Sequence, residues 1–183
     1  MRAPLRLVAV LVSLLLANGC AQNPQRRAAD LIENLRNPDA AAVDRAVRQL
    51  VEMGEPAVPA LVLALKDPEA RVRNAAASAL WGLGPKAHDA VPTLAEALAD
   101  NDDGVRLGVV MALESIGRDS AAAVPALARA VRDRDGNVRL WAAKALAKIG
   151  PPARAALPAL TDAARYDSTR TAAEDAIRAI KGP

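Results

Sequence analysis

The chain repeats itself with a period of about 33 residues, and this period restricts its possible folds more than any other feature. Arg73, Arg106 and Arg139 each follow a valine and stand one period apart. The same interval separates three leucines, three glycines and three prolines: Leu80, Leu113 and Leu146; Gly84, Gly117 and Gly150; Pro92, Pro125 and Pro158. A unit this short cannot bury an apolar face alone, so the copies are expected to stack.

Each unit contains two amphipathic patterns with helical spacing. The first has apolar residues at i, i+3, i+4 and i+7 from Val72 to Leu83, and the second runs from Val91 to Leu98. Gly84-Pro85 is expected to end the first helix, and Pro92 is tolerable if the second helix begins about one turn earlier. The acidic residue between units, such as Asp67, can cap or orient the next first helix.

The units divide the chain after its first residues. We expect a repeat domain over residues 25–183, with units at about 37–65, 66–98, 99–131 and 132–164 and a terminal half unit at 165–183. Residues 25–36 match the second half of a further copy. The sequence therefore predicts an all-α solenoid of about four helical pairs with half-repeat caps.

The stretch "DPEARVRNAAASALWGLG", residues 67–84, resembles the short HEAT-like repeat of the phycobilisome-lyase type. The resemblance covers most of residues 25–182, and neither the ankyrin nor the tetratricopeptide signature occurs. It implies a right-handed α-α superhelix. It implies little about activity, because such repeats serve lyases, hydroxylases, glycosylase-like proteins and plain scaffolds.

The first twenty residues have the pattern of an export signal. Arg2 and Arg6 precede an apolar run at 7–17, which is too short to span a bilayer as a helix. Gly19-Cys20 resembles the lipobox of bacterial lipoproteins. We expect a signal peptide over 1–19, lipidation of Cys20, a short tether at 20–24 and an envelope location, with the outer membrane favoured where one exists. Conventional signal cleavage near this point is the alternative.

The charge of the chain gives no general attraction to nucleic acid. Two of its 24 Lys and Arg residues, Arg2 and Arg6, lie in the leader, which leaves 22 against 21 Asp and Glu. A net charge near +1 supplies little non-specific affinity for a phosphate backbone. We therefore expect protein partners and the membrane, and no nucleic acid.

A column of arginines is expected along the stack, one from each unit. It could form an anion-binding stripe, or each guanidinium could bridge the loops between units by bonding a carboxylate or carbonyl. An aspartate precedes each of the first three arginines by six residues, which favours the structural interpretation. The column comprises Arg73, Arg106, Arg139 and Arg170, with Asp67, Asp100 and Asp133 as its acidic residues.

Residues that differ between units are the candidates for partner binding. Apolar residues at outward or half-outward positions of the first helices could form a convex patch or could fill grooves between units: Trp81, Leu107, Val110, Met111 and Leu140. Trp141 is expected to fill space against the fifth helix of the first type, which lies in the terminal half unit at 165–183. The second helices, which line the concave side in proteins resembling this one, carry a mixed column: Leu63, Glu96, Arg129 and Asp162.

Catalytic residues are not evident in the sequence. His88 is the single histidine, Cys20 is the single cysteine, and no Gly-rich phosphate loop or nucleophile-base pair is visible. We expect no cofactor and no metal. The sequence favours a non-catalytic protein-binding scaffold or adaptor at a bacterial envelope membrane, and the alternative is a lyase-like or oxidoreductase-family HEAT enzyme or its accessory.

Overall fold

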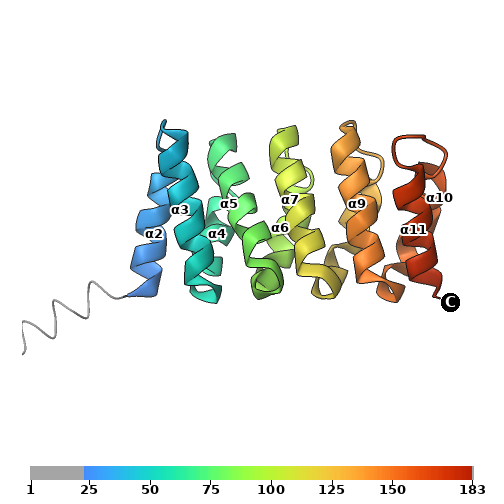
Figure 1. Cartoon of the computed structure of the whole chain (residues 1–183), viewed down its shortest axis with the longest axis horizontal. Helices are drawn as coiled ribbons and strands as arrows, with labels where there is room; N and C mark the ends of the chain where they lie inside the picture. The colour runs from blue at the N-terminus through green and yellow to red at the C-terminus, as the bar shows by residue number, and fades with distance from the viewer. Residues whose placement is uncertain (1–22, 183) are drawn as a thin grey trace, which may run out of the picture.

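A computed structural model describes residues 23–182, which form a row of antiparallel helices in two layers (Figure 1). The expected signal peptide and Cys20 lie outside the described residues. We call the helices of the front layer A helices and those of the rear layer B helices. The A helices are α3 (Ala40–Met53), α5 (Ala70–Leu83), α7 (Asp103–Ile116), α9 (Gly136–Ile149) and α11 (Arg170–Lys181); the B helices are α4 (Val58–Ala64), α6 (Val91–Ala97), α8 (Val124–Ala130) and α10 (Leu157–Ala163).

Four A helices end on a glycine whose backbone conformation excludes other residues. Gly54, Gly84, Gly117 and Gly150 have φ between 57° and 77° with ψ near −140°. A side chain with a Cβ atom is strained in this region, so the recurring glycine fixes the end of each A helix.

Short 3-10 segments connect the A helix of each unit to its B helix. They are η1 (Glu55–Ala57), η2 (Gly84–Ala90), η3 (Gly117–Ala123) and η4 (Pro151–Ala156). Pro92 is the second residue of α6, where the missing N–H has no intrahelical partner. The prediction that the second helix begins about one turn before Pro92 was wrong. A helical turn does precede Pro92, but it is a 3-10 turn and the α-helix begins at Val91.

The hydrophobic core runs along the whole stack between the two layers. Leucines at the same register of successive A helices have no exposed surface, and neither do those of the B helices: Leu50, Leu80, Leu113 and Leu146; Leu61, Leu94, Leu127 and Leu160. Neighbouring A helices approach closely where small residues meet: a Cβ atom on Gly108 in α7 would lie 3.1 Å from the Cβ of Ala77 in α5. The buried leucines of all units thus belong to one continuous core.

The loops between units are shaped by two acidic positions. Asp100 accepts a hydrogen bond from the Asp102 N–H at 2.9 Å, and Asp102 caps α7 by accepting from the Val105 N–H at 3.0 Å. Asp133 and Asp135 repeat this arrangement before α9. The aspartates that recur with the repeat period therefore orient the loop, while before α7 and α9 the capping role belongs to the residue two positions later.

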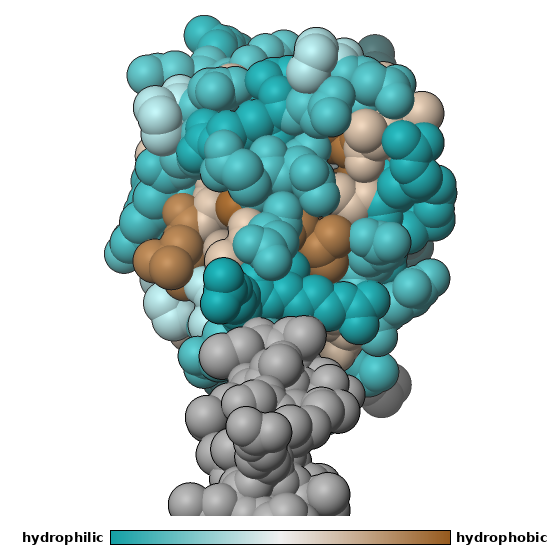
Figure 2. All heavy atoms as spheres, turned by 90° about the vertical axis from the view of Figure 1, so that its left-hand side faces the viewer, coloured by the Kyte–Doolittle hydropathy of each residue, from teal (hydrophilic) through white to brown (hydrophobic). Residues whose placement is uncertain are grey.

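Both ends of the stack are closed by helices with a polar outer surface. The first is α2 (Pro24–Asn34), which packs on α3 and α4 through Ala28 and Leu31 and exposes polar side chains. Figure 2 views this end, where hydrophilic side chains cover most of the surface. At the other end α11 buries Ala173, Ala176 and Ile180. Polar terminal helices of this kind keep a solenoid from stacking further.

The helices between residues 23 and 182 are all too short or too polar to be candidates for crossing a bilayer.

Candidate functional site

Arg73 binds two successive units at once. Its Nε and Nη2 atoms donate to the two carboxylate oxygens of Asp100 at 2.7 and 2.8 Å. Its Nη1 atom donates to the carbonyls of Asp67 and Pro68 at 2.8 and 3.0 Å. The sequence paired Arg73 with Asp67, six residues before it. The structure shows that this contact is to the backbone and that the carboxylate comes from the next unit.

Arg106 repeats this geometry one unit later. Nε and Nη2 donate to Asp133 at 2.8 and 2.9 Å, and Nη1 donates to the carbonyls of Asp100 and Asn101. The side chains of Arg106 and Asp133 are only 6% and 11% exposed. We call this series of arginine–aspartate contacts the ladder. With both charges bonded and covered, Arg73 and Arg106 are structural and not available to a ligand.

The ladder lowers the pKa of its aspartates. At Asp100 the hydrogen bond from Arg73 is the largest influence and lowers the pKa, against a smaller rise from burial. At Asp133 burial is the largest single influence and raises the pKa, but the hydrogen bonds from Arg106 and from the Asp135 N–H, together with the charges of Arg106 and Arg134, lower it overall. The same hydrogen bonds raise the pKa of Arg73 and Arg106. All four groups are therefore charged at neutral pH.

These shifts predict the acid stability of the fold. Since both pKa values lie below the ordinary 3.8, the unfolded chain takes up protons first as the pH falls. The stabilisation is complete about one pH unit above the unfolded-state pKa and is lost as the pH drops through the folded-state values. We expect the free energy of unfolding, measured with urea, to decline as the pH is lowered below about 5. Asp133→Asn should start lower and decline less steeply, and parallel declines would contradict the prediction.

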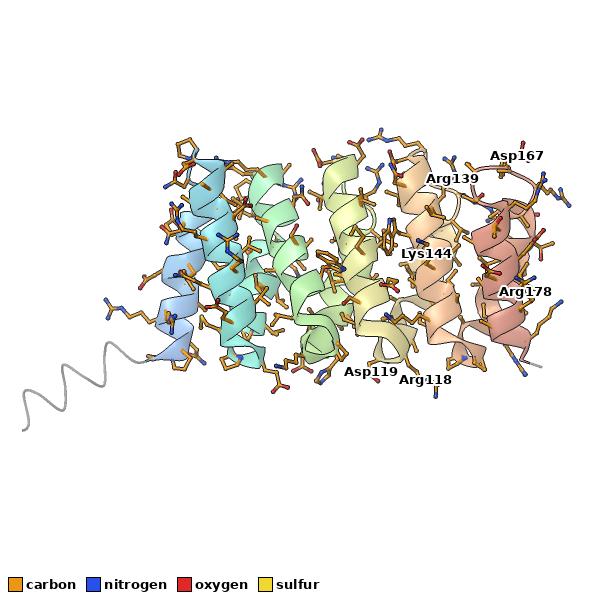
Figure 3. The ribbon with its side chains drawn as sticks, in the orientation of Figure 1. Arg118, Asp119, Arg139, Lys144, Asp167 and Arg178 are labelled. Carbon is orange, nitrogen blue, oxygen red and sulfur yellow. The ribbon has the colours of Figure 1, made fainter. Side chains whose placement is uncertain are left out.

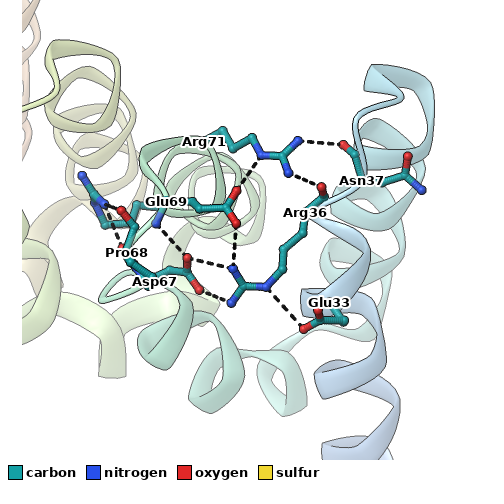
Figure 4. Close-up of polar contacts among 8 residues, drawn as sticks. Glu33, Arg36, Asn37, Asp67, Pro68, Glu69 and Arg71 are labelled. Carbon is teal, nitrogen blue, oxygen red and sulfur yellow. Dashed lines mark hydrogen bonds and ion pairs between the residues drawn. The ribbon is translucent and has the colours of Figure 1, made fainter.

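At the N-terminal end of the ladder Asp67 has no arginine from the A helix of the preceding unit, and Arg36 binds it instead. It comes from the turn after α2 and donates to both carboxylate oxygens of Asp67 and to Glu69 (Figure 4). Arg71 joins Glu69 and the Arg36 carbonyl to the same cluster. The sequence prediction missed Arg36, because it lies outside the register of the repeat.

At the C-terminal end the ladder stops. Arg139 keeps the contacts of Nη1 to the carbonyls of Asp133 and Arg134, at 2.9 and 3.1 Å, but its Nη2 atom meets only the Ser168 hydroxyl at 3.3 Å. Arg170 reaches the Ala164 carbonyl at 3.4 Å and pairs with the exposed Asp167. The last two arginines of the predicted column thus hold backbone carbonyls and lack the carboxylate of a following unit.

The mixed column of the B helices is exposed at three positions and half-buried at Asp162, and we call it the B face: Leu63, Glu96, Arg129 and Asp162. Leu63 is 74% exposed, which is unusual for leucine in this chain. Glu96 pairs with Lys66 at 3.5 Å and Asp162 with Arg132 at 2.6 Å, each pair joining adjacent units. The structure brings these side chains onto one surface, as the register predicts.

Pockets border the B face. One of about 460 Å³ is largely apolar and lies between α4 and η2, beside Val58, Val62 and Leu63. A second, of about 300 Å³, lies between the ends of α4 and α6 beside Lys66 and Glu96. A third, of about 530 Å³, lies between the ends of α8 and α10: its lining is Arg132, Asp133, Arg139, Asp162, Arg165 and Tyr166. The residues of this last pocket were not predicted to lie together, although tyrosine at 166 interrupts the series of aspartates.

The apolar candidates on the A helices do not form one exposed surface. Trp81 is 47% exposed, whereas Leu107, Met111 and Leu140 are half-buried. Val110 is fully buried, so its prediction as an outward position was wrong. The half-buried positions favour packing in grooves between units over a continuous patch.

Trp141 is half-buried and packs against the core, with the Lys144 ammonium 4.4 Å from its ring centroid. Its equivalent in α7 is Gly108, where a Cβ atom would lie 3.1 Å from the Cβ of Ala77 in α5. In α7 this position therefore faces the preceding unit. The prediction that Trp141 packs on α11, the fifth A helix, stays a prediction.

Groups of acidic, histidine or cysteine side chains suited to a metal ion do not occur in residues 23–182. His88 lies on the surface in η2, with Nδ1 3.2 Å from the Pro85 carbonyl and Nε2 3.3 Å from Asp89. Neither contact belongs to a catalytic arrangement.

Solved structures similar to the chain include a designed armadillo repeat protein and a phycocyanin lyase complex. A designed armadillo repeat protein in complex with the peptide (KR)4 has 19% identity and a TM-score of 0.64, with 83% of this chain and 81% of that chain covered. The complex of CpcE and CpcF of phycocyanin lyase from Nostoc sp. has 20% identity and a TM-score of 0.65, over 82% and 98% of the two chains. An engineered protein has 24% identity and a TM-score of 0.59, over 84% and 79%. At these identities the likeness establishes the fold alone.

A family model for HEAT repeats matches residues 28–114 and 91–181. No sequence among curated proteins matches the chain. The matched segments contain the repeated glycines, the buried leucines and the ladder described above. They span most of the chain, which therefore belongs to the HEAT-repeat family.

Proposed function

We propose that this protein is a non-catalytic scaffold that binds a protein partner on its B face. The observation that carries the proposal is that the residues that hold the units together recur, whereas the surface residues of the B helices differ from unit to unit. Buried leucines, terminal glycines and ladder residues recur from unit to unit, whereas one surface position of the B helices carries Leu63, Glu96, Arg129 and Asp162. A rigid frame with variable exposed positions is how repeat proteins obtain specificity.

The B face offers both apolar and charged contacts. Leu63 borders the apolar pocket between α4 and η2. Glu96 and Asp162 each pair with a cation of the preceding unit, Lys66 and Arg132. The equivalent position before Arg129 is Ala99, and Arg129 makes no ion pair within residues 23–182. An extended segment with an apolar side chain near α4 and an acidic one near α8 complements this surface.

The similar designed armadillo repeat protein is in complex with a peptide, which supports peptide recognition by this type of fold. The alternative proposal, supported by the similarity to the phycocyanin lyase complex, is that this protein is an enzyme accessory.

We place the scaffold at a bacterial envelope membrane, anchored through Cys20. The support is the leader pattern of residues 1–20 and the position of α2, which begins at Pro24. Three residues would link the lipid to the Asn23–Pro24 helix start, a reach of about 10 Å at most. Mass spectrometry of the N-terminal peptide tests this: an acylated Cys20 is expected, and an unmodified terminus would remove the anchor.

Site-specific photo-cross-linking in the producing cells tests partner binding. A photoreactive amino acid placed at Leu63, Glu96 or Arg129 should give an adduct of the same mass from all three positions, because one bound segment would pass them in turn. Lys144, exposed on the A helix α9, is the matched control and should give no such adduct.

Adducts from position 144 alone would contradict binding at the B face. Absence of any protein adduct, together with a small-molecule product that depends on the protein, would favour the enzymatic alternative.

A further inference from the structure

We call each arginine of the ladder, together with the aspartate of the next unit that it binds, a rung. The last rung has its arginine, Arg139, but no aspartate from a following unit. Asp67, Asp100 and Asp133 stand one repeat period apart, and the next position in the series is Tyr166. The Nε and Nη2 edge of Arg73 and of Arg106 binds both oxygens of a carboxylate. In Arg139 that edge contacts only the Ser168 hydroxyl, through Nη2.

Arg139 is nevertheless held as its equivalents are. Its Nη1 atom donates to the carbonyls of Asp133 and Arg134 at 2.9 and 3.1 Å, and the corresponding bonds of Arg106 are 2.9 and 3.3 Å. The guanidinium is therefore fixed on one side, with its carboxylate-binding edge directed away from those carbonyls. An oriented donor pair binds a carboxylate with less loss of side-chain entropy than a mobile one.

The pocket beside this edge has a volume of about 530 Å³ and an excess of positive charge. Its two carboxylates are already paired, Asp133 with Arg106 and Asp162 with Arg132. Arg139 and Arg165 have no ion pair in the part of the chain that the structure describes. A pocket of this size accommodates a side chain together with some of its backbone.

One further carboxylate lies nearby but does not fill the rung. Figure 3 shows Asp167 on the loop between α10 and α11, at the same edge of the molecule as Arg139. The Asp167 carboxylate pairs with Arg170 at 2.6 Å, and its side chain is 91% exposed. Within residues 23–182 the edge of Arg139 therefore meets the Ser168 hydroxyl of this loop but no carboxylate.

We propose that this pocket is a receptor for an acidic segment of a protein partner, whose Asp or Glu carboxylate completes the rung on Arg139. The bound carboxylate takes the position that Asp100 holds on Arg73 and Asp133 holds on Arg106. Arg165 supplies a second positive charge, and Tyr166, 62% exposed, supplies an apolar surface beside it.

The lining of the pocket favours a carboxylate over a phosphate. Asp133 and Asp162 both face it, and their charges repel a doubly charged phosphate more than a singly charged carboxylate. A second copy of this chain does not supply the missing group in the same way, because its first loop carries Asn37 and its Asp39 caps α3. The proposal goes beyond the B face and does not depend on binding there.

Titration of the isotope-labelled protein with blocked peptides, followed by NMR, tests the site. The probe is an acetylated and amidated copy of residues 97–101, whose Asp100 forms a natural rung. We expect this peptide to shift the Arg139 Nε–H resonance, and the D100N peptide to bind about tenfold more weakly or worse. Succinate and inorganic phosphate are the small-molecule arms, and equal or tighter binding of either would overturn assignment to a protein segment.

Tyr166→Asp should supply the missing carboxylate from the chain itself and so block binding of a partner's carboxylate. The new carboxylate is expected to pair with Arg139, raise Tm by about 3 °C and weaken peptide binding about tenfold. Arg139→Gln should also abolish binding, and Arg154→Gln, an exposed arginine of η4, is the matched control that should not. Peptide binding that survives Tyr166→Asp would overturn the proposal, while cross-links at Leu63 would remain a separate measure of the B face.

Discussion

Arg106→Gln is expected to lower the free energy of unfolding by about 3 kcal/mol, because it breaks a covered ion pair and strands the remaining charge. Arg106 is 6% exposed and donates four hydrogen bonds, two to Asp133 and two to backbone carbonyls. After the substitution the Asp133 carboxylate keeps the Asp135 N–H and loses both guanidinium donors. Urea unfolding of the purified protein, followed by circular dichroism at neutral pH, measures the loss.

Arg132→Gln is the matched control for this experiment. Arg132 pairs with Asp162 at 2.6 Å, but their side chains are 55% and 48% exposed. Exposed pairs contribute little, so we expect a change within about 0.5 kcal/mol. Losses of similar size at Arg106 and Arg132 would show that the ladder does not join the units.

Leu113→Ala is expected to cost about 3–4 kcal/mol, because it opens a cavity in the middle of the stack. Leu113 has no exposed surface and lies in α7, which packs on α5 before it and on α9 after it. The cavity therefore weakens two interfaces between units at once. The loss is measured by the same unfolding experiment, with the steepness of the transition reporting whether both halves still unfold together.

Leu63→Ala provides the comparison, since Leu63 is 74% exposed. We expect its effect on stability to stay within about 0.5 kcal/mol. A large loss at Leu63 would mean that this leucine belongs to the core and not to a binding surface. A small loss at Leu113 would mean that the stack relaxes to fill the cavity.

Much of the fold is predictable from local patterns in the sequence. The recurrence of leucine at helical spacing identifies the buried face of each helix, and glycine at positions 84, 117 and 150 marks where the A helices end. Both signals act within one unit, so a repeating sequence states them several times. The 3-10 segments were not predicted, because proline near the start of a helix is equally compatible with an earlier α-helical turn.

The pairing of the ladder could not be read from sequence distance. Arg73 has one aspartate shortly before it, Asp67, and another in the next unit, Asp100. Both make contact, but only Asp100 does so through its carboxylate. The choice depends on the separation of adjacent units, which is a property of the stacking.

Part of the candidate site was likewise predictable from the sequence, and part depends on the tertiary structure. The register of the B helices was sufficient to predict that Leu63, Glu96, Arg129 and Asp162 share one surface. The register also contains the exception at Tyr166, but its meaning emerges only beside Arg139, whose free edge the tertiary structure leaves next to a pocket.

The sequence by itself determined the helices, the ends of the A helices, the buried leucines and the fact that the units stack, because each depends on patterns within a single repeat. The tertiary structure alone decided which charges are neutralised and which remain accessible. A guanidinium is part of the frame where the next unit brings a carboxylate within hydrogen-bonding distance. It is a potential binding group where, at the last rung, no described residue does so.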